Sequence, residues 1–192
     1  MDTKNIERYL TSFGKEVIRG SKAALSKAGK GGGNLENSLK FKVVADSKGF
    51  EVNFFMADYG TFVDKGVKGA GGEIKSGKHK GSYGGRRHYV TWDGKRKDSP
   101  YQFGSGKGTG SIYKGIGSFI RKKGLQPRSE GGQYMTTLGL KIAIVKVLWI
   151  KGIHGISFFQ KPLGHAWKTF GKGLLKNLGK DIVTTVNKTQ IK

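Results

Sequence analysis

Residues 38–56 read SLKFKVVADSKGFEVNFFM, with apolar and polar side chains alternating on both sides of a short turn sequence. Leu39 and Phe41 begin the alternation in the first half, and Phe50 and Val52 begin it in the second. Alternation with a period of two is typical of strands that bury one face. The residues between the halves, DSKG, favour a tight connection. The stretch therefore predicts a β-hairpin whose apolar face is covered by another element.

Helices are predicted on both sides of this hairpin, because apolar residues recur there at spacings of three and four. The segment before the hairpin ends at the glycine run 29–33, as expected past a helix C-terminus. A strand over residues 140–148 competes with the third helix, which is apolar nearly all round and is expected to be buried. The predicted helices cover residues 4–28, 111–124, 134–151 and 162–187.

The order of these elements predicts an α+β fold, with a small antiparallel sheet packed by an N-terminal helix and C-terminal helices. We expect residues 1–192 to form a single domain that carries a long, Gly-rich basic loop, residues 66–111. This loop, the basic arm, holds thirteen Gly, ten Lys or Arg and three acidic residues. It shows no sustained period, apart from a small hairpin predicted at HYVTWDGKR. Loops of this length inside a domain are usually functional or disordered.

The charge of the chain points to an anionic partner. The formal net charge is +23 at pH 7, from 36 Lys and Arg against 13 Asp and Glu. A compact chain with this charge repels itself unless a polyanion or an acidic protein surface lies nearby. In the basic arm, cations that can neutralise phosphates alternate with aromatic rings that can stack on bases. The residues predicted to contact DNA or a neighbouring protein are Arg86, Arg87, Tyr89, Trp92, Lys95, Arg96, Lys97 and Lys107.

The same sequence gives little support for catalysis or a cofactor. There is no Cys, which excludes disulfides, thiol nucleophiles and Cys-ligated zinc. The four His show no metal-ligand spacing, and FGSGKGTGS lacks the Lys-Ser or Lys-Thr pair of a phosphate loop. No signal peptide or membrane span is visible. We therefore expect a protein that is not an enzyme and has no catalytic residues, metal or cofactor.

Two segments, ADYGTFVDKGVKG (57–69) and KGIHGISFFQKPLGHAW (151–167), resemble the neck and tail-completion proteins of tailed phages. That family often pairs a Tyr, acid and Gly at a strand end with an Arg-Pro-Phe-Leu type of opening to the final helix. The segment GSIYKGIGSFIRKKGLQPR (110–128) is similar to the family's middle helix. The basic arm is longer than the family leads one to expect, and no Arg precedes Phe158, which leaves the exact position in the neck open. The positions that match the motifs are Tyr59, Phe62, Asp64, Gly66, Phe158, Phe159, Pro162 and Leu163.

The resemblance implies a structural virion protein that forms a ring at the head–tail junction, around the DNA channel. It implies a six- or twelve-fold homo-oligomer that contacts portal or adaptor and tail proteins, with non-specific contact to packaged DNA and no membrane. By the same resemblance, Tyr59, Phe62 and Asp64 would close the sheet edge and fix the turn. Phe158, Phe159 and Pro162 would anchor the last helix. The alternative interpretation is a nucleic-acid-binding basic protein of the ribosome- or nucleoid-associated type.

Overall fold

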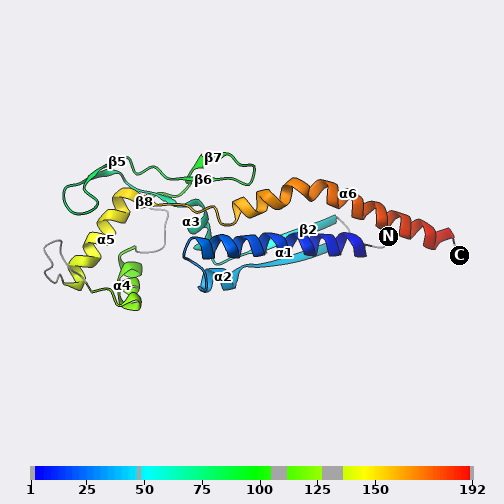
Figure 1. Ribbon diagram of the computed structural model, residues 1–192, viewed down its shortest axis with the longest axis horizontal. Coiled ribbons are helices and arrows are strands. Elements are labelled where there is room, and N and C mark those ends of the chain that lie inside the picture. The colour runs from blue at the N-terminus through cyan, green and yellow to red at the C-terminus, as the bar shows by residue number, and fades with distance from the viewer. Residues whose placement is uncertain (1–2, 47–48, 105–111, 127–135, 191–192) are drawn as a thin grey trace. The chain divides into compact units, whose positions relative to one another are not determined.

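The protein is seen in a computed structural model that describes residues 3–46, 49–104, 112–126 and 136–190 (Figure 1). The described residues group into two compact units, where the sequence predicts one domain. Unit 1 comprises residues 1–64, 90–97 and 156–192, and unit 2 comprises residues 65–89 and 98–155. Each unit is therefore assembled from segments that are distant in the sequence.

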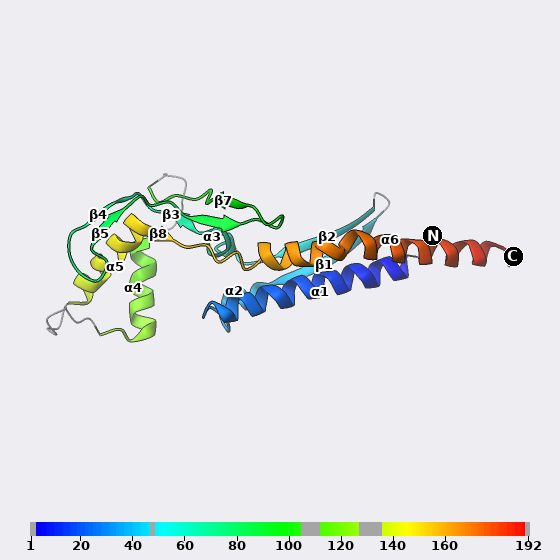
Figure 2. The ribbon, with the colours of Figure 1, turned by 45° about the horizontal axis from the view of Figure 1, so that its top comes forward.

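Unit 1 is built from two long antiparallel helices and the predicted hairpin. Helix α1 (Lys4–Lys27) packs along helix α6 (Gln160–Gln190), and the two lie side by side in both ribbon views (Figures 1 and 2). Strands β1 (Lys40–Asp46) and β2 (Gly49–Phe55) pair antiparallel and pack against α1. Two short helices, α2 (Asn34–Ser38) and α3 (Gly60–Lys65), precede and follow the hairpin.

The core of unit 1 lies where the apolar stripe of α1 meets α6 and the hairpin. One buried cluster contains Phe13, Val17 and Ala166, with Phe54 and Phe170 packed against it. A second buried cluster lies toward the C-terminal end of α1 and consists of Leu25, Leu35, Leu39 and Phe158. Apolar side chains from α1, α2, the start of β1 and the start of α6 thus bury one another, which stabilises unit 1 by the hydrophobic effect.

The N-terminus of α1 is capped from α6. The N-cap residue Thr3 makes no side-chain capping bond. Instead, Asp181 accepts hydrogen bonds from the backbone N–H groups of Asn5 (3.1 Å) and Ile6 (2.9 Å), and from the Asn5 side chain (2.7 Å). Free N–H groups and a partial positive charge at a helix N-terminus favour such a carboxylate. Asp181 is fully buried, and its hydrogen bonds to the start of α1 fix the register of α6 on α1.

Unit 2 combines two helices with short strands. Helix α4 (Ile112–Lys123) packs on helix α5 (Thr137–Lys151). Strand β3 (Val67–Lys68) pairs antiparallel with β8 (Gly152–Ile153), and β4 (Gly72–Ile74) pairs with β5 (Gly81–Tyr83). Gly152, at φ 77°, ends α5 and lies so close to the β3 backbone that a Cβ there would overlap the Val67 carbonyl oxygen.

The described part of the basic arm contains short paired strands. Besides β3, β4 and β5, it holds β6 (His88–Val90) and β7 (Arg96–Asp98), which pair as the hairpin expected at HYVTWDGKR. Single backbone bonds join other parts of the arm, such as Gly69 N–H to the Gly85 carbonyl oxygen at 2.8 Å. The arm is still a long Gly-rich insertion, and the backbone hydrogen bonds of these short strands hold its described part in place.

The α+β class and its packing by N- and C-terminal helices are confirmed, as are the hairpin and the four predicted helices. Two local expectations are wrong. The strand end that the resemblance implies around Phe62 is helix α3. Helix α5 is a helix as preferred, but it is only partly buried: Leu138 is 57% exposed and Ile142 is 51% exposed. Periodicity does not predict this exposure, because a helix that is apolar nearly all round has no continuous polar face to mark its solvent side.

Candidate functional site

The two segments that carry the family resemblance meet in unit 1 around Asp64. The Asp64 carbonyl oxygen accepts from Ser157 N–H at 2.9 Å, and the Val63 carbonyl oxygen accepts from Ile156 N–H at 3.1 Å. The Asp64 carboxylate accepts from the backbone N–H of Phe159 at 2.8 Å. We call this group, residues 63–64 and 156–159, the Asp64 corner.

Asp64 acts at the corner as a remote cap for α6. Its side chain is buried. It accepts from the N–H of Phe159, which precedes the helix, and lies 3.5 Å from the N–H of Gln160, the first helical residue. The α6 N-terminus therefore receives a carboxylate from α3, as the α1 N-terminus receives one from α6. Both buried aspartates of unit 1 have a structural use.

The rest of the corner seats the opening of α6 in the core. Ser157 has a left-handed backbone, at φ 51°, and its hydroxyl accepts from Val90 N–H at 2.8 Å. The turn aims Phe158 into the buried cluster with Leu25, where it is fully buried. Phe159 packs edge-on against Phe54 of β2, with ring centroids 5.4 Å apart.

The other motif positions are near the corner residues in the sequence. Tyr59 is in the turn before α3, and Phe62 is on α3; both are about half exposed and neither belongs to a strand. The assignment of these two residues to a sheet edge is therefore wrong, because the chain turns into a helix there. Pro162 lies in the first turn of α6, and Leu163 packs against the core cluster. In unit 2, Gly66 has φ 74° and lies against the Gly155 backbone.

Trp92, predicted to stack on a partner, packs on α6 within unit 1. Its ring centroid lies 5.8 Å from that of Trp167, and the backbone N–H of Trp92 donates to the Gln160 side-chain oxygen at 3.1 Å. A Cβ at Gly164 would overlap the Trp92 carbonyl oxygen, so the hairpin tip lies directly on the helix backbone. The Trp92 side chain is still 48% exposed. It can present an edge to a partner while its position is fixed by α6.

The hairpin tip next to Trp92 contains a local charge pair. Lys95 Nζ lies 3.1 Å from Asp93, whose carboxylate also accepts from the Thr91 hydroxyl. The Thr91 hydrogen bond, followed by Lys95, lowers the pKa of Asp93 from 3.8 to about 2. The charge of Lys95 is thus paired with that of Asp93, which makes Lys95 a weaker candidate for phosphate contact than the sequence suggests.

The remaining predicted arm residues are divided between the units. Arg86, Arg87 and Tyr89 belong to unit 2, whereas Arg96 and Lys97 belong to unit 1. The Lys65 ammonium lies 5.8 Å from the Tyr89 ring centroid, and Arg87 donates to the Arg86 carbonyl oxygen at 3.0 Å. Within the described ranges, Arg86, Arg96 and Lys97 are exposed and form no ion pair. Lys107 lies outside the described residues.

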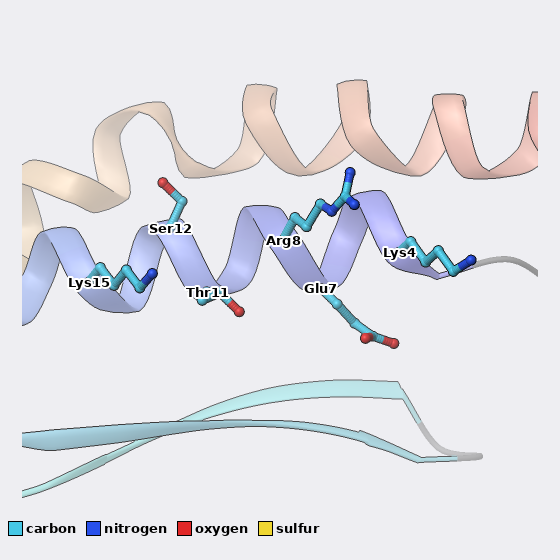
Figure 3. Close-up of a pocket in the computed structure, with 6 residues that line it drawn as sticks. All are labelled: Lys4, Glu7, Arg8, Thr11, Ser12 and Lys15. Atoms are coloured by element: carbon cyan, nitrogen blue, oxygen red, sulfur yellow. The ribbon is translucent and has the colours of Figure 1, made fainter.

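A second positive region, on the two long helices, was missed by the sequence analysis. A hollow on the outer side of α1 is lined by Lys4, Glu7, Arg8, Thr11, Ser12 and Lys15, and Arg8 points toward α6 in Figure 3. On α6, five lysines and His165 form a row of exposed side chains. The signal is the spacing of the lysines of residues 161–180, whereas the predicted helix rests on the apolar stripe of that segment alone.

Comparisons of this chain with family models, with curated protein sequences and with solved structures give no match. Among the described residues, no group of three or more His, Asp and Glu lies close enough to hold a metal ion. None of the helices in the described ranges is long and apolar enough to cross a membrane.

Proposed function

We propose that this chain is a structural protein of a tailed-phage virion, which forms a ring at the head–tail junction around the DNA channel. The observation that carries the proposal is the Asp64 corner. It brings together two motifs that lie more than ninety residues apart in the sequence and that resemble one family. Contact between the motifs supports the view that they form one structural unit of that family.

The chemistry of the corner fits a structural role. Asp64 and Phe158 are both buried, and Asp64 accepts backbone N–H groups, so these residues hold α6 in place. The proposal therefore assigns them to positioning the last helix and assigns no catalysis to the chain.

Exposed apolar side chains on the helices fit assembly with other chains. Leu138 on α5, and Leu175 and Val183 on α6, are each more than half exposed, with Leu175 at 70%. Exposed apolar groups on one chain are often covered in an assembly. In a closed ring each subunit has a neighbour on two sides, which would supply such cover.

Deletion of the gene from a tailed phage that encodes this chain tests the proposal. The expected result is DNA-filled heads and separate tails in electron micrographs, with infectious particles restored when the wild-type chain is supplied. As a control, a chain that carries Asp58→Ala at an exposed carboxylate should restore infectious particles as the wild-type chain does. Normal particles after deletion, or a failure to make heads at all, would reject the assignment to the junction.

A further inference from the structure

The lysines of α6 form a regular row on one face of the helix. From Lys161 to Lys180, five lysines and His165 are spaced by four, three, four, four and four residues, which places them on the same side of a helix with about 5–6 Å between neighbouring Cβ atoms. At about 1.5 Å of rise per residue the row extends about 28 Å. We call it the lysine ridge. Its members are Lys161, His165, Lys168, Lys172, Lys176 and Lys180.

The ridge is exposed and lacks compensating charge. All six side chains are exposed, and no ion pair involves any of them within the part of the chain that the structure describes. The only acidic residue of α6 is Asp181, which is fully buried and caps α1. The field of the lysines therefore points away from the core and toward solvent.

We propose that the lysine ridge is a binding surface for the phosphate backbone of double-stranded DNA. A row of about 28 Å corresponds to about eight base pairs along the duplex axis. Lysine is a flexible point charge that suits contact with phosphates without regard to sequence. The largest rings near the ridge, Trp92 and Trp167, pack against each other or against Phe170, so they are not arranged for stacking on single-stranded bases.

The hollow on α1 offers a second group of cations in unit 1, next to one acidic residue, Glu7. Arg8 and Lys15 line the hollow on α1, together with the hydroxyl-bearing Thr11 and Ser12 (Figure 3). Hydroxyl groups also donate hydrogen bonds to phosphate oxygens.

A helix on a membrane inserts its apolar face. On α6, Leu163, Ala166 and Phe170 are packed in the core of unit 1, whereas Leu175 and Val183 are exposed. Binding to vesicles is therefore one of the outcomes that the test below distinguishes.

The inference rests on the proposed function only for the place where the chain would meet DNA. The test uses the full-length purified chain and a fluorescent duplex of about 25 base pairs and arbitrary sequence, with binding measured by anisotropy between about 50 and 200 mM NaCl. The variant Lys168→Gln, Lys172→Gln, Lys176→Gln removes three charges from the ridge. Its matched control, Lys75→Gln, Lys78→Gln, Lys80→Gln, removes three exposed charges from unit 2.

We expect the ridge variant to bind about 10²-fold more weakly at 0.1 M salt, with the slope of log K against log salt smaller by about 2.7, since each phosphate contact contributes about 0.9. The control should lose less than about threefold and keep the slope. Both variants should melt like the wild type, because all the replaced lysines are exposed. Bound duplex should also protect the ridge lysines of the wild-type chain from chemical acetylation, as measured by mass spectrometry. This second measurement needs no substitution.

Equal weakening by the two variants would overturn the inference, because it would mean that only total charge matters. Tight binding to phosphatidylserine vesicles that the duplex fails to displace would overturn it in favour of a membrane surface. DNA binding through the ridge by a chain that never enters particles would reject the proposed function and leave this inference standing. If the chain enters particles but the ridge substitutions do not weaken its binding to DNA, this inference would be rejected and the proposed function would stand.

Discussion

Two buried aspartates show how single residues set the arrangement of unit 1. Asp181 accepts the first N–H groups of α1, and Asp64 accepts those at the start of α6. Each carboxylate comes from a segment far away in the sequence, so each cap also ties two segments together. Sequence analysis singled out Asp64 through a resemblance and passed over Asp181, because a cap supplied by another element has no local pattern.

Replacement of Asp181 by Ala is expected to destabilise the protein by about 2–3 kcal/mol, because three hydrogen bonds to a buried carboxylate are lost. Urea denaturation followed by circular dichroism measures the change. Asp58→Ala, at an exposed carboxylate, is the control and should change stability by less than about 0.5 kcal/mol. Equal stability of the two variants would show that the Asp181 cap contributes little.

The turn at Asp93 is expected to respond to acid. Its folded pKa of about 2 lies below its ordinary value of 3.8, so the carboxylate stabilises the turn above about pH 4 and this contribution is lost as the pH falls toward 2. An NMR titration of the Asp93 carboxyl should show the low midpoint. Thr91→Val should raise the midpoint, since the Thr91 hydroxyl is the largest cause. A midpoint near 4 in the wild type would contradict the hydrogen-bonded turn.

At the scale of elements, α6 illustrates which features a sequence predicts and which it does not. Its apolar stripe and the position of Pro162 in its first turn follow from spacing and from the conformation of proline. The effect of its glycines depends on the neighbours of each. Nothing lies within 4 Å of a Cβ placed at Gly171 or Gly179, whereas Gly164 lies against the Trp92 backbone.

The glycines of α6 should therefore respond in opposite ways to replacement by Ala. Gly171→Ala and Gly179→Ala are expected to stabilise the protein by about 0.5–1 kcal/mol each, because Ala favours the helix. Gly164→Ala should destabilise it by more than about 1 kcal/mol, since the Trp92 carbonyl would have to move. Thermal unfolding of the three variants measures this. The same sign at all three positions would refute the packing of the hairpin tip on α6.

Helices and the hairpin could be predicted because their patterns are local, but the pairing of distant segments could not. The basic arm, with its thirteen Gly, offers no periodicity, and its short ladders form where glycines allow backbones to approach, as at Gly69 and Gly85. The candidate site was likewise predicted only in part. Trp92 and Lys95 were expected to reach a partner, and each has a contact within unit 1 that the sequence does not reveal.

For the whole molecule, a net charge of +23 per copy opposes assembly of bare chains into a ring. Salt screens this repulsion, with a Debye length of about 10 Å at 0.1 M and about 3 Å at 1 M. Light scattering after size exclusion should therefore show more ring at high NaCl than at low NaCl. Dissociation of the ring by salt would instead indicate an interface held by ion pairs.

The most direct test of the central claim is the position of the chain in the particle. Electron cryomicroscopy of the virion, with density assigned by the α1–α6 pair and the β1–β2 hairpin, should place a ring of copies between portal and tail. Cross-linking mass spectrometry on the same particles should join the chain to its neighbours there. Virions that contain no copy of the chain, or that carry it only at a site away from the head–tail junction, would contradict the account.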